Sequence, residues 1–396
     1  MAGLEPSKGS ETCTVNEAMY SLLVAASVAM NDSQTVKMLD MAERIAINAL
    51  PAPWRNGSMW GLQYHHQVNA FSAPQHAHDP GVDPDSLGFG LPYECCAANS
   101  QQGWPRYAER GLAMRSVADQ GLFLTGYTPA TTVDGQRVVS VTGSYPFDDD
   151  VPIRIICANR GPAFPLWLRV PGWAARPSMT IQTAPARSTK NGLANGGGAI
   201  WLAPGTLRRV VCGTGNTTIV LSLPMAVRVE RRLHGAVAVS RGPSLYGLPV
   251  NVSRVVTGAY YPPHGVDESL VADGPWRFGL VLPPAGMPAS AAVRHRRAEI
   301  PPGTLGPWVA GAVRGGVLDV TMRQINAAAW PAANCTTNFG GYVDSCPGSN
   351  PQSPLSPADC SSTGCNDVSM ALVPFGALDV GLAELPFFEG VLTEGM

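Results

Sequence analysis

The chain has 396 residues, of which 45% are hydrophobic and 14% are charged, and its formal net charge is −2. This length allows roughly two or three domains with buried cores, and the near-neutral charge argues against a nucleic-acid binder, which would carry a basic stripe. The longest strongly apolar run, residues 22–30, is too short to cross a bilayer, so we expect neither a nucleic-acid nor a membrane partner.

Residues 1–121 are predicted to be helical. Thr14 and Glu17 have the spacing of a capping box, and apolar residues behind them recur at helical intervals as far as Ala26. A second helix is expected after residues 31–33 and should end before Pro51. Its expected apolar stripe is Met38, Met41, Ala42, Ile45, Ala46 and Ala49. A third helix is expected over residues 105–117.

From residue 122 onward the chain changes to short β-type runs separated by turn clusters. Examples are "GLFLTGY", "VVSVTG", "IRIICA" and "TIVLSLP". This pattern is typical of all-β sandwiches or barrels. We therefore predict an α+β multidomain chain with a helical domain (1–121), a β-sandwich domain (122–230) and a second β-sandwich region (231–396).

The cysteines are unevenly distributed. Four of the nine lie in a Pro/Ser/Gly-rich loop, residues 335–365, and we expect them to pair as disulfides: Cys335, Cys346, Cys360 and Cys365. Asn-X-Ser/Thr triplets begin at Asn31, Asn56, Asn216, Asn251 and Asn334. Both features favour the secretory pathway, although no signal peptide is visible in this chain.

A second set of cysteines suggests a metal site. Glu11 and Cys13 precede the first predicted helix, whose N-terminus favours thiolate and carboxylate groups. Cys95 and Cys96 are adjacent, in a predicted turn before the third helix, and neighbouring cysteines do not easily form a disulfide with each other. Three thiolates and one carboxylate suit tetrahedral zinc. Spacing alone favours buried free thiols over a metal site.

Two further features have a structural and a functional interpretation. His76, His78 and Asp79 could bind a second metal ion, but a solvated loop is the simpler interpretation. Four tryptophans in strand-like segments are expected to fill cores, whereas an exposed pair could bind carbohydrate: Trp167, Trp173, Trp201 and Trp276.

Several segments resemble glycoside hydrolase family 127, the β-L-arabinofuranosidase-type enzymes. The most specific are "SETC" before an amphipathic helix and "ECCAANSQQGWPRY". The segments "FPLWLRVPGWA", "VSRGPSLYGL", "PWRFGLVL" and "LVPFGALDVGLAELPFF" follow in the family's order. The resemblance covers nearly the whole chain apart from residues 335–365.

The resemblance implies a fold and a chemistry. The fold is a helical (α/α)₆ barrel followed by β-sandwich domains, so residues 1–121 would be the remnant of such a barrel. The ligands of a zinc ion would be Glu11, Cys13, Cys95 and Cys96, and Cys95 would also be the nucleophile. The implied reaction is the retaining hydrolysis of β-L-arabinofuranosides through a thioglycosyl intermediate, with a carbohydrate as the partner.

The general acid is where the chain departs from this pattern. Retention requires an acid/base carboxyl about 5 Å from the nucleophile. In the family it lies a short way upstream of the glutamate and cysteine ligands, which here falls before Met1. Glu5 and Glu94 are the nearest substitutes, and neither has the family's setting. We therefore expect a chain that lacks the first part of the barrel. The alternative is a non-catalytic carbohydrate-binding sandwich protein with a structural zinc site.

Overall fold

The computed structural model describes residues 9–29, 31–54, 61–71, 87–88, 94–148, 152–183, 198–232, 235–261, 265–284, 286–297, 316–327, 330, 336–337, 343–345 and 366–389. The chain divides into two compact units. Unit 1 consists of Met1–Asn16, Ile47–Gln101 and Val227–Met396, and unit 2 consists of Glu17–Ala46 and Gln102–Ala226. The predicted boundaries near residues 121 and 230 stay predictions.

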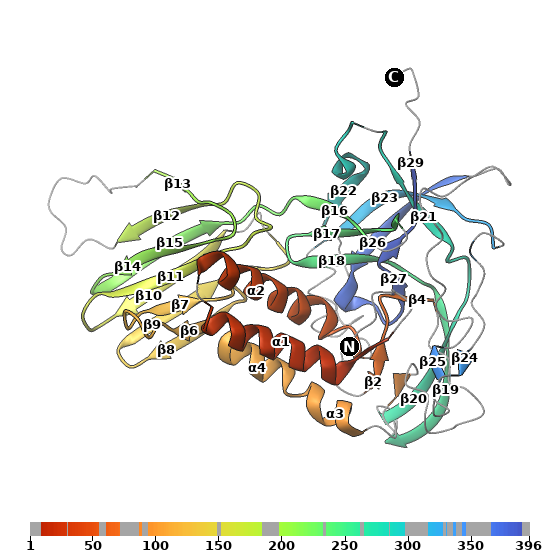
Figure 1. Ribbon diagram of the computed structural model, residues 1–396, viewed down its shortest axis with the longest axis horizontal. Coiled ribbons are helices and arrows are strands. Elements are labelled where there is room, and N and C mark those ends of the chain that lie inside the picture. The colour runs from red at the N-terminus through yellow and green to blue at the C-terminus, as the bar shows by residue number, and fades with distance from the viewer. Residues whose placement is uncertain are drawn as a thin grey trace. The chain divides into compact units, whose positions relative to one another are not determined.

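The described chain is mostly β-structure with a few helices near its N-terminus (Figure 1). This content confirms the α+β class. Among the described residues, no helix combines the length and the hydrophobicity that crossing a membrane would require.

Unit 2 contains a β-sandwich. One sheet has the described strands in the order β13 (Ile200–Trp201), β12 (Ser178–Thr183), β15 (Gly215–Ser222), β10 (Ile153–Asn159), β9 (Arg137–Thr142) and β8 (Ala130–Asp134). The other has the order β14 (Thr206–Cys212), β11 (Phe164–Val170), β7 (Leu122–Leu124) and β6 (Ala113–Arg115). The strand-like segments predicted after residue 122 therefore form strands.

The core of this sandwich follows from the period-2 alternation of its strands. In β10, Ile153, Ile155 and Cys157 are buried, while the residues between them are exposed. Phe164 and Leu166 of β11 belong to the same apolar cluster. A disulfide between Cys157 of β10 and Cys212 of β14 joins the two sheets within this core. A sequence separation of 55 residues gave no indication of this pair.

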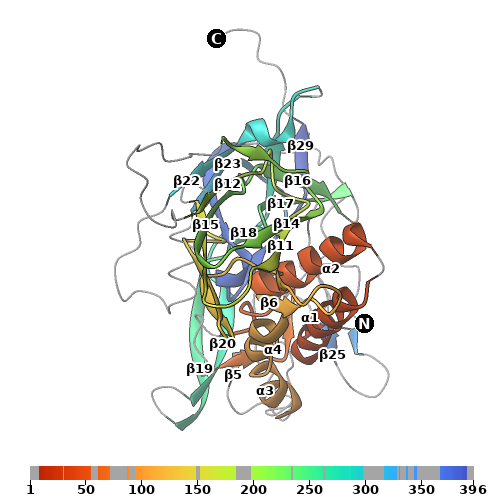
Figure 2. The same ribbon diagram turned by 90° about the vertical axis from the view of Figure 1, so that its left-hand side faces the viewer.

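Helices lie beside the four-stranded sheet of unit 2. They are α2 (Asp32–Arg44) and α4 (Gly103–Arg110), together with the part of α1 (Thr12–Ser27) that belongs to this unit. In the turned view the sandwich strands run toward the viewer, with these helices on one side (Figure 2). Helix α2 begins as predicted, because Asn31 Oδ1 accepts a hydrogen bond from the Gln34 N–H at 2.9 Å.

Two other helix predictions were wrong. Helix α1 begins at Thr12, two residues before the expected capping box, because strand pairing delivers the chain directly into the helix and the Thr12 N–H bonds to Tyr64 O at 3.0 Å. Helix α4 ends at Arg110 and not near residue 117, because the following residues form β6, which pairs with β7. The chain turns at Gly111, where a Cβ would lie 2.4 Å from the Tyr107 ring.

The predicted apolar stripe of α2 is displaced by a buried ion network. Met41 is 48% exposed, whereas Glu43 is only 2% exposed. Arg169 of β11 is fully buried, and its guanidinium contacts Glu43 Oε1 at 2.6 Å and Asp40 Oδ1 at 2.8 Å. Tyr145 donates a hydrogen bond to the same Glu43 oxygen. The charge on Arg169 lets a glutamate occupy a core position, which hydrophobic periodicity cannot indicate.

Unit 1 is built on a larger sheet. Its described strands follow the order β16 (Val227–Arg231), β17 (Val237–Arg241), β18 (Ser244–Pro249), β26 (Asp367–Pro374), β23 (Val317–Gln324), β21 (Phe278–Leu282) and β29 (Phe387–Glu389). Four strands pair beside this path: β4 (Asn69–Ala70), β22 (Val293–Arg296), β27 (Gly381–Leu382) and β28 (Glu384–Leu385). A second sheet contains β19 (Val252–Tyr261), β20 (Gly265–Ala272), β5 (Leu87–Gly88) and β2 (Leu62–Gln63).

The tryptophans divide between core and surface. Trp173 and Trp276 are buried, as predicted. Trp167 is half-buried, and its indole N–H donates to Asp119 Oδ2 at 2.9 Å. The core prediction was wrong for Trp201, which lies on the edge strand β13 and is 65% exposed. An edge strand has only one neighbour, so its side chains have less of the sheet to cover them.

Candidate metal centre

The segment that carries Glu11 and Cys13 is held by a short strand pair in unit 1. Strand β1 (Ser10–Glu11) pairs with β3 (His65–His66), which places Glu11 opposite His65. The hydroxyl of Thr12 also donates to Gln63 O at 3.0 Å. Gly9 allows this approach, because a Cβ there would lie 2.5 Å from the Cβ of His65. The backbone therefore fixes where helix α1 starts and where Cys13 points.

Cys95 and Cys96 lie in the first turn of α3 (Glu94–Ser100), not in a turn as predicted. Because successive helical residues point about 100° apart, the two thiols face different surroundings. Cys96 is fully buried in an apolar cluster with Trp54 and Leu62, whereas Cys95 is exposed. The helix thus presents one thiol to the interior and one to solvent.

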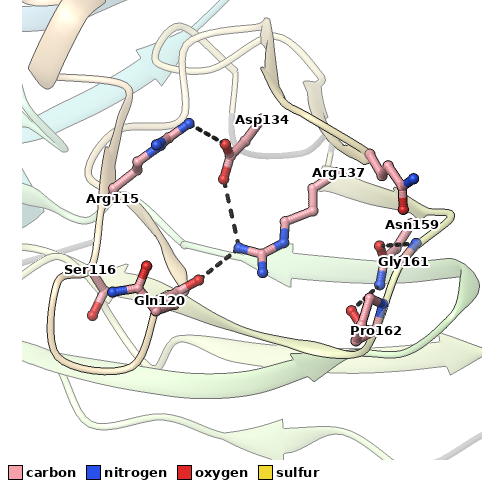
Figure 3. Close-up of a pocket in the computed structure, with 10 residues that line it drawn as sticks. Arg115, Ser116, Gln120, Asp134, Arg137, Asn159, Gly161 and Pro162 are labelled. Atoms are coloured by element: carbon pink, nitrogen blue, oxygen red, sulfur yellow. Dashed lines mark hydrogen bonds and ion pairs between the residues drawn. The ribbon is translucent and has the colours of Figure 1, made fainter.

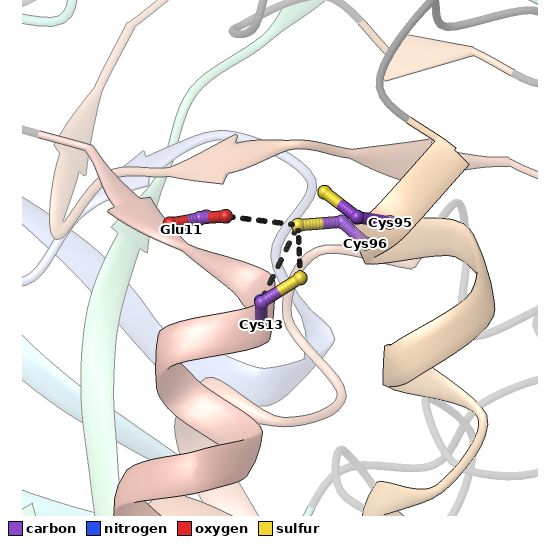
Figure 4. A group of neighbouring side chains, drawn as sticks. All are labelled: Glu11, Cys13, Cys95 and Cys96. Carbon is purple, nitrogen blue, oxygen red and sulfur yellow. Dashed lines mark hydrogen bonds between the residues drawn. The ribbon is translucent and has the colours of Figure 1, made fainter.

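The four residues singled out in the sequence converge on one point (Figure 4). One donor atom from each of Glu11, Cys13, Cys95 and Cys96 lies within 4.8 Å of the other three. The Sγ atoms of Cys13 and Cys96 are 3.0 Å apart, beyond the roughly 2.05 Å of a disulfide bond, and all three thiols are free. The predicted convergence is confirmed. We call these four residues the thiol–carboxylate group.

Neighbouring polar groups orient the donors. The hydroxyl of Tyr64 donates to Glu11 Oε1 at 2.8 Å and lies 3.9 Å from Cys95 Sγ. Asn99 Nδ2 donates to Cys13 Sγ at 3.3 Å, and the Cys13 N–H donates to Cys96 Sγ at 3.3 Å. Hydrogen bonds of this kind fix the ligand atoms of metal sites and tune them.

Sequence reasoning missed these supporting roles. No spacing rule links Tyr64 to Glu11 across 53 residues. The side-chain amide of Asn99 reaches Cys13, while its backbone carbonyl accepts from Asn16 Nδ2 at 2.6 Å. The strand pairing of β1 with β3 is the link that sequence did not reveal.

The electrostatics of the group favour a cation. Burial raises the pKa of the Cys13 thiol, and burial together with the neighbouring Cys13 thiol raises that of Cys96. Burial and the adjacent Glu11 carboxylate likewise raise the pKa of the Tyr64 hydroxyl. Within the described residues, none of the hydrogen-bond partners of Glu11, Cys13, Cys95 or Cys96 is cationic.

A bound metal ion would supply the missing positive charge. Sulfur-rich donors with one carboxylate and an arrangement this compact suit zinc. The donor set and its surroundings therefore fit the zinc ion expected from the sequence.

Other predicted functional residues lie outside the described part of the chain. These are Glu5, His76, His78, Asp79, Cys335, Cys346, Cys360 and Cys365. Glu94 begins α3, but its side chain is also outside the described set.

Comparisons with solved structures give the fold. The chain is similar to a family 127 β-L-arabinofuranosidase from Geobacillus stearothermophilus T6, with a TM-score of 0.56 and 16% identity over 98% of this chain and 51% of that chain. A structure described as a glycoside hydrolase matches with a TM-score of 0.56 and 14% identity, over 97% and 53% of the two chains. A further family 127 β-arabinofuranosidase matches with a TM-score of 0.51 and 14% identity, over 97% and 51%.

No family model matches the sequence, and no curated protein does. The chain spans about half the length of the solved structures that it matches. At this level of identity the likeness concerns the fold. Nearly the whole chain therefore shares its fold with about half of each of these family 127-type glycoside hydrolases.

Proposed function

We propose that this chain carries the nucleophile and metal half of a retaining glycoside hydrolase of the family 127 type, acting on β-L-arabinofuranosides. The observation that carries the proposal is the convergence of Glu11, Cys13, Cys95 and Cys96. The fold similarity to glycoside hydrolases supports a carbohydrate as the substrate class. On this proposal the N-terminal helices are part of a helical barrel.

Cys95 is the proposed nucleophile because of its exposure. Of the three thiols, Cys96 is fully buried and Cys13 is half-buried, so Cys95 is best placed to meet a substrate. The hydroxyl of Tyr64, near Cys95 Sγ and bonded to Glu11, would hold the carboxylate in place while the thiol reacts. Cys13, Cys96 and Glu11 would be ligands only, and a bound zinc ion would keep the thiols deprotonated at neutral pH.

The proposed reaction has two displacements. In the first, Cys95 Sγ forms a bond to the anomeric carbon while the glycosidic C–O bond breaks and the departing oxygen takes a proton from a general acid. In the second, water attacks the anomeric carbon, the C–S bond breaks, and the acid's conjugate base receives the proton from water. Two inversions give net retention.

The general acid is unassigned. Within the described residues the thiol–carboxylate group holds one carboxylate, Glu11, and that residue is taken as a ligand. A positioned acid contributes about 10²–10⁴-fold to such reactions. We therefore propose that this chain by itself cleaves arabinofuranosides with a nitrophenolate leaving group, which needs little protonation, far better than alkyl arabinofuranosides.

The test combines metal content with turnover. We expect one zinc per chain by elemental analysis and slow release of nitrophenol from a nitrophenyl β-L-arabinofuranoside. Cys95→Ala should abolish this release, and mass spectrometry should detect a glycosyl adduct on Cys95 of the wild-type chain. A matched control is Cys157→Ala together with Cys212→Ala, which removes the core disulfide without touching the group. Nitrophenol release that survives Cys95→Ala would contradict the nucleophile assignment.

The same samples distinguish the hydrolase from a non-catalytic alternative. A carbohydrate-binding sandwich protein with a structural zinc site would bind arabinofuranosides equally well before and after Cys95→Ala, and would show no adduct.

We also propose that the protein follows the secretory pathway. The disulfide between Cys157 and Cys212 is typical of an oxidising compartment. Three of the predicted glycosylation triplets begin at exposed residues, Asn31, Asn216 and Asn251. The protein would be expressed in a eukaryotic secretory host and its mass measured before and after treatment with an N-glycosidase. A loss of mass on treatment would support this proposal, whereas finding only unmodified asparagines would count against glycosylation.

A further inference from the structure

A polar cavity of about 360 Å³ lies entirely within unit 2, whereas the thiol–carboxylate group lies within unit 1. Its volume is near the lower end of the range of about 300–1,000 Å³ found for ligand sites, which suits one sugar-sized unit. Most of its lining side chains are polar. The six that matter here are Arg115, Gln120, Asp134, Gln136, Arg137 and Asn159.

Turns and strand ends bring these residues together. Arg115 ends β6, and the turn between β8 and β9 supplies Asp134, Gln136 and Arg137, with Gly135 at a φ of 62° closing it. Gln120 has a φ of 55°, a conformation that is uncommon outside glycine and often occurs at functional sites.

Arg137 is fixed at the centre of the cavity. Its Nη1 donates to Gln120 O at 2.6 Å and lies 3.6 Å from Asp134 Oδ2, as Figure 3 shows. Its guanidinium stacks over the buried ring of Phe164, 4.8 Å from the ring centre. These contacts hold the head group in one orientation before any ligand arrives, which lowers the entropic cost of binding.

The cavity has more hydrogen-bond donors and more positive charge than its own residues use. Arg115 is paired with Asp134 through Nη2, and its side chain is 76% exposed. Among the described residues, no hydrogen bond uses Nε or Nη2 of Arg137, or Nε or Nη1 of Arg115. Two guanidinium groups thus face one carboxylate.

A nearby acid does not restore the balance. Asp119, on the same loop as Gln120, is engaged by the Trp167 indole and lies 3.7 Å from Arg209. The surplus of donors therefore suits an acceptor-rich ligand with a negative charge. Planar guanidinium forks match a carboxylate in particular.

The remaining polar groups are suited to hydroxyls. Asp134 can accept hydrogen bonds from hydroxyl groups, and the Gln136 amide can donate or accept them. A bare sulfate has no hydroxyl groups to offer these side chains, and a bare phosphate has few. We infer that this cavity binds a hexuronate unit of a glycan, its carboxylate on Arg115 and Arg137 and its hydroxyls toward Asp134 and Gln136.

The test is calorimetric titration of the intact chain with sodium glucuronate and galacturonate, and with glucose and galactose as uncharged counterparts. We expect saturable binding of at least one uronate and at least tenfold weaker binding of both neutral sugars. Arg115→Gln should weaken uronate binding about tenfold or more, because it removes a charge-assisted contact. Arg137→Gln should do the same, but it also removes the contact with Gln120.

Arg154→Gln is the matched control. It removes an exposed arginine from β10 of the same sandwich and should leave the affinity within twofold. Thermal unfolding of each variant checks the fold, and Arg115→Gln is the cleaner substitution because that side chain is mostly exposed. Cys95→Ala should not alter uronate binding, so this inference and the proposed hydrolase activity can fail separately.

Four results would overturn the inference. They are binding of both uronates no stronger than that of the neutral sugars, equally strong competition by inorganic sulfate or phosphate, an affinity for both uronates that is undetectable at millimolar concentration, and an affinity that is insensitive to Arg115→Gln.

Discussion

Each of the two units gathers a cluster of acidic groups, and the source of the compensating charge differs between them. In unit 2, the Asp40 and Glu43 carboxylates share the buried guanidinium of Arg169, at 2.8 and 2.6 Å. In unit 1, Glu11 and three thiols gather within 4.8 Å with no cationic partner among the described residues. The cluster in unit 2 thus draws its compensating positive charge from an arginine of the same fold.

On the proposed function, the second cluster takes its compensating charge from a bound metal ion. Without one, burial raises the pKa of the Cys13 and Cys96 thiols, so they remain protonated and nearly neutral. A structural polar core and a proposed ligand site thus differ in the source of the compensating charge.

Removing the external cation should have the largest effect. Structural zinc contributes about 10–16 kcal/mol to small zinc-finger peptides. Because unit 1 also has its own apolar core, chelation should cost less than this. We still expect the free energy of unfolding to fall by more than about 5 kcal/mol. Calorimetry with and without a chelator measures it. A reductant must be present, because Cys13 and Cys96 are close enough to oxidise once the metal leaves.

Cys96→Ala is the control for this experiment. It removes one ligand, so its melting temperature should already be low and should not respond to the chelator. A wild-type melting temperature that is indifferent to the chelator would mean that the group holds no metal.

Removing the internal cation should cost slightly less. Arg169→Leu leaves Glu43 buried and uncompensated, and breaking such a pair typically costs about 3–5 kcal/mol. Replacing the acids as well, with Asp40→Asn and Glu43→Leu, should recover most of the loss. Urea unfolding measures both, with Arg208→Leu as an exposed control on β14 expected within about 0.5 kcal/mol. No recovery in the triple variant would mean that packing, and not charge, is what Arg169 provides.

Acidification tests how protonation of a buried histidine affects the stability of unit 1. His66 is buried against Phe375, and burial lowers its pKa from 6.5 to about 4. The unfolded chain therefore binds the proton more tightly, and stability must fall as the pH drops from above 6.5 toward 4, by up to about 3 kcal/mol. In His66→Gln the slope of stability against pH over this window should be smaller. An unchanged slope would show that other groups cause the acid sensitivity.

The smallest effect concerns orientation. Tyr64→Phe removes the hydrogen bond to Glu11 without removing a ligand, and loss of such a partner typically weakens metal binding about 10–100-fold. Competition with a zinc-binding dye measures the affinity. Tyr20→Phe, which keeps the ring beneath Arg106, should leave it unchanged. Equal affinities for Tyr64→Phe and wild type would assign Tyr64 to packing alone.

Local sequence patterns determined those features of the fold that depend only on residues close together in the chain. The Asn31 cap, the alternating strands after residue 122 and the pairing of Glu11 with Cys13 beside a helix start are all short-range features. The resemblance of two separate motifs to one family also predicted that Cys13 and Cys96, 83 residues apart, share a site. The structure confirms that these two side chains lie next to each other.

Only the tertiary structure decided which polar groups are buried and what accompanies them. Glu43 occupies a core position because Arg169 arrives from a strand more than a hundred residues away, and Tyr64 reaches Glu11 because β1 pairs with β3. Likewise Cys157 meets Cys212 because two sheets face each other. Periodicity reports how a segment divides between water and core. It does not report which distant charge or hydrogen bond offsets the cost of burying a polar group, because that partner is set by how the chain folds back on itself.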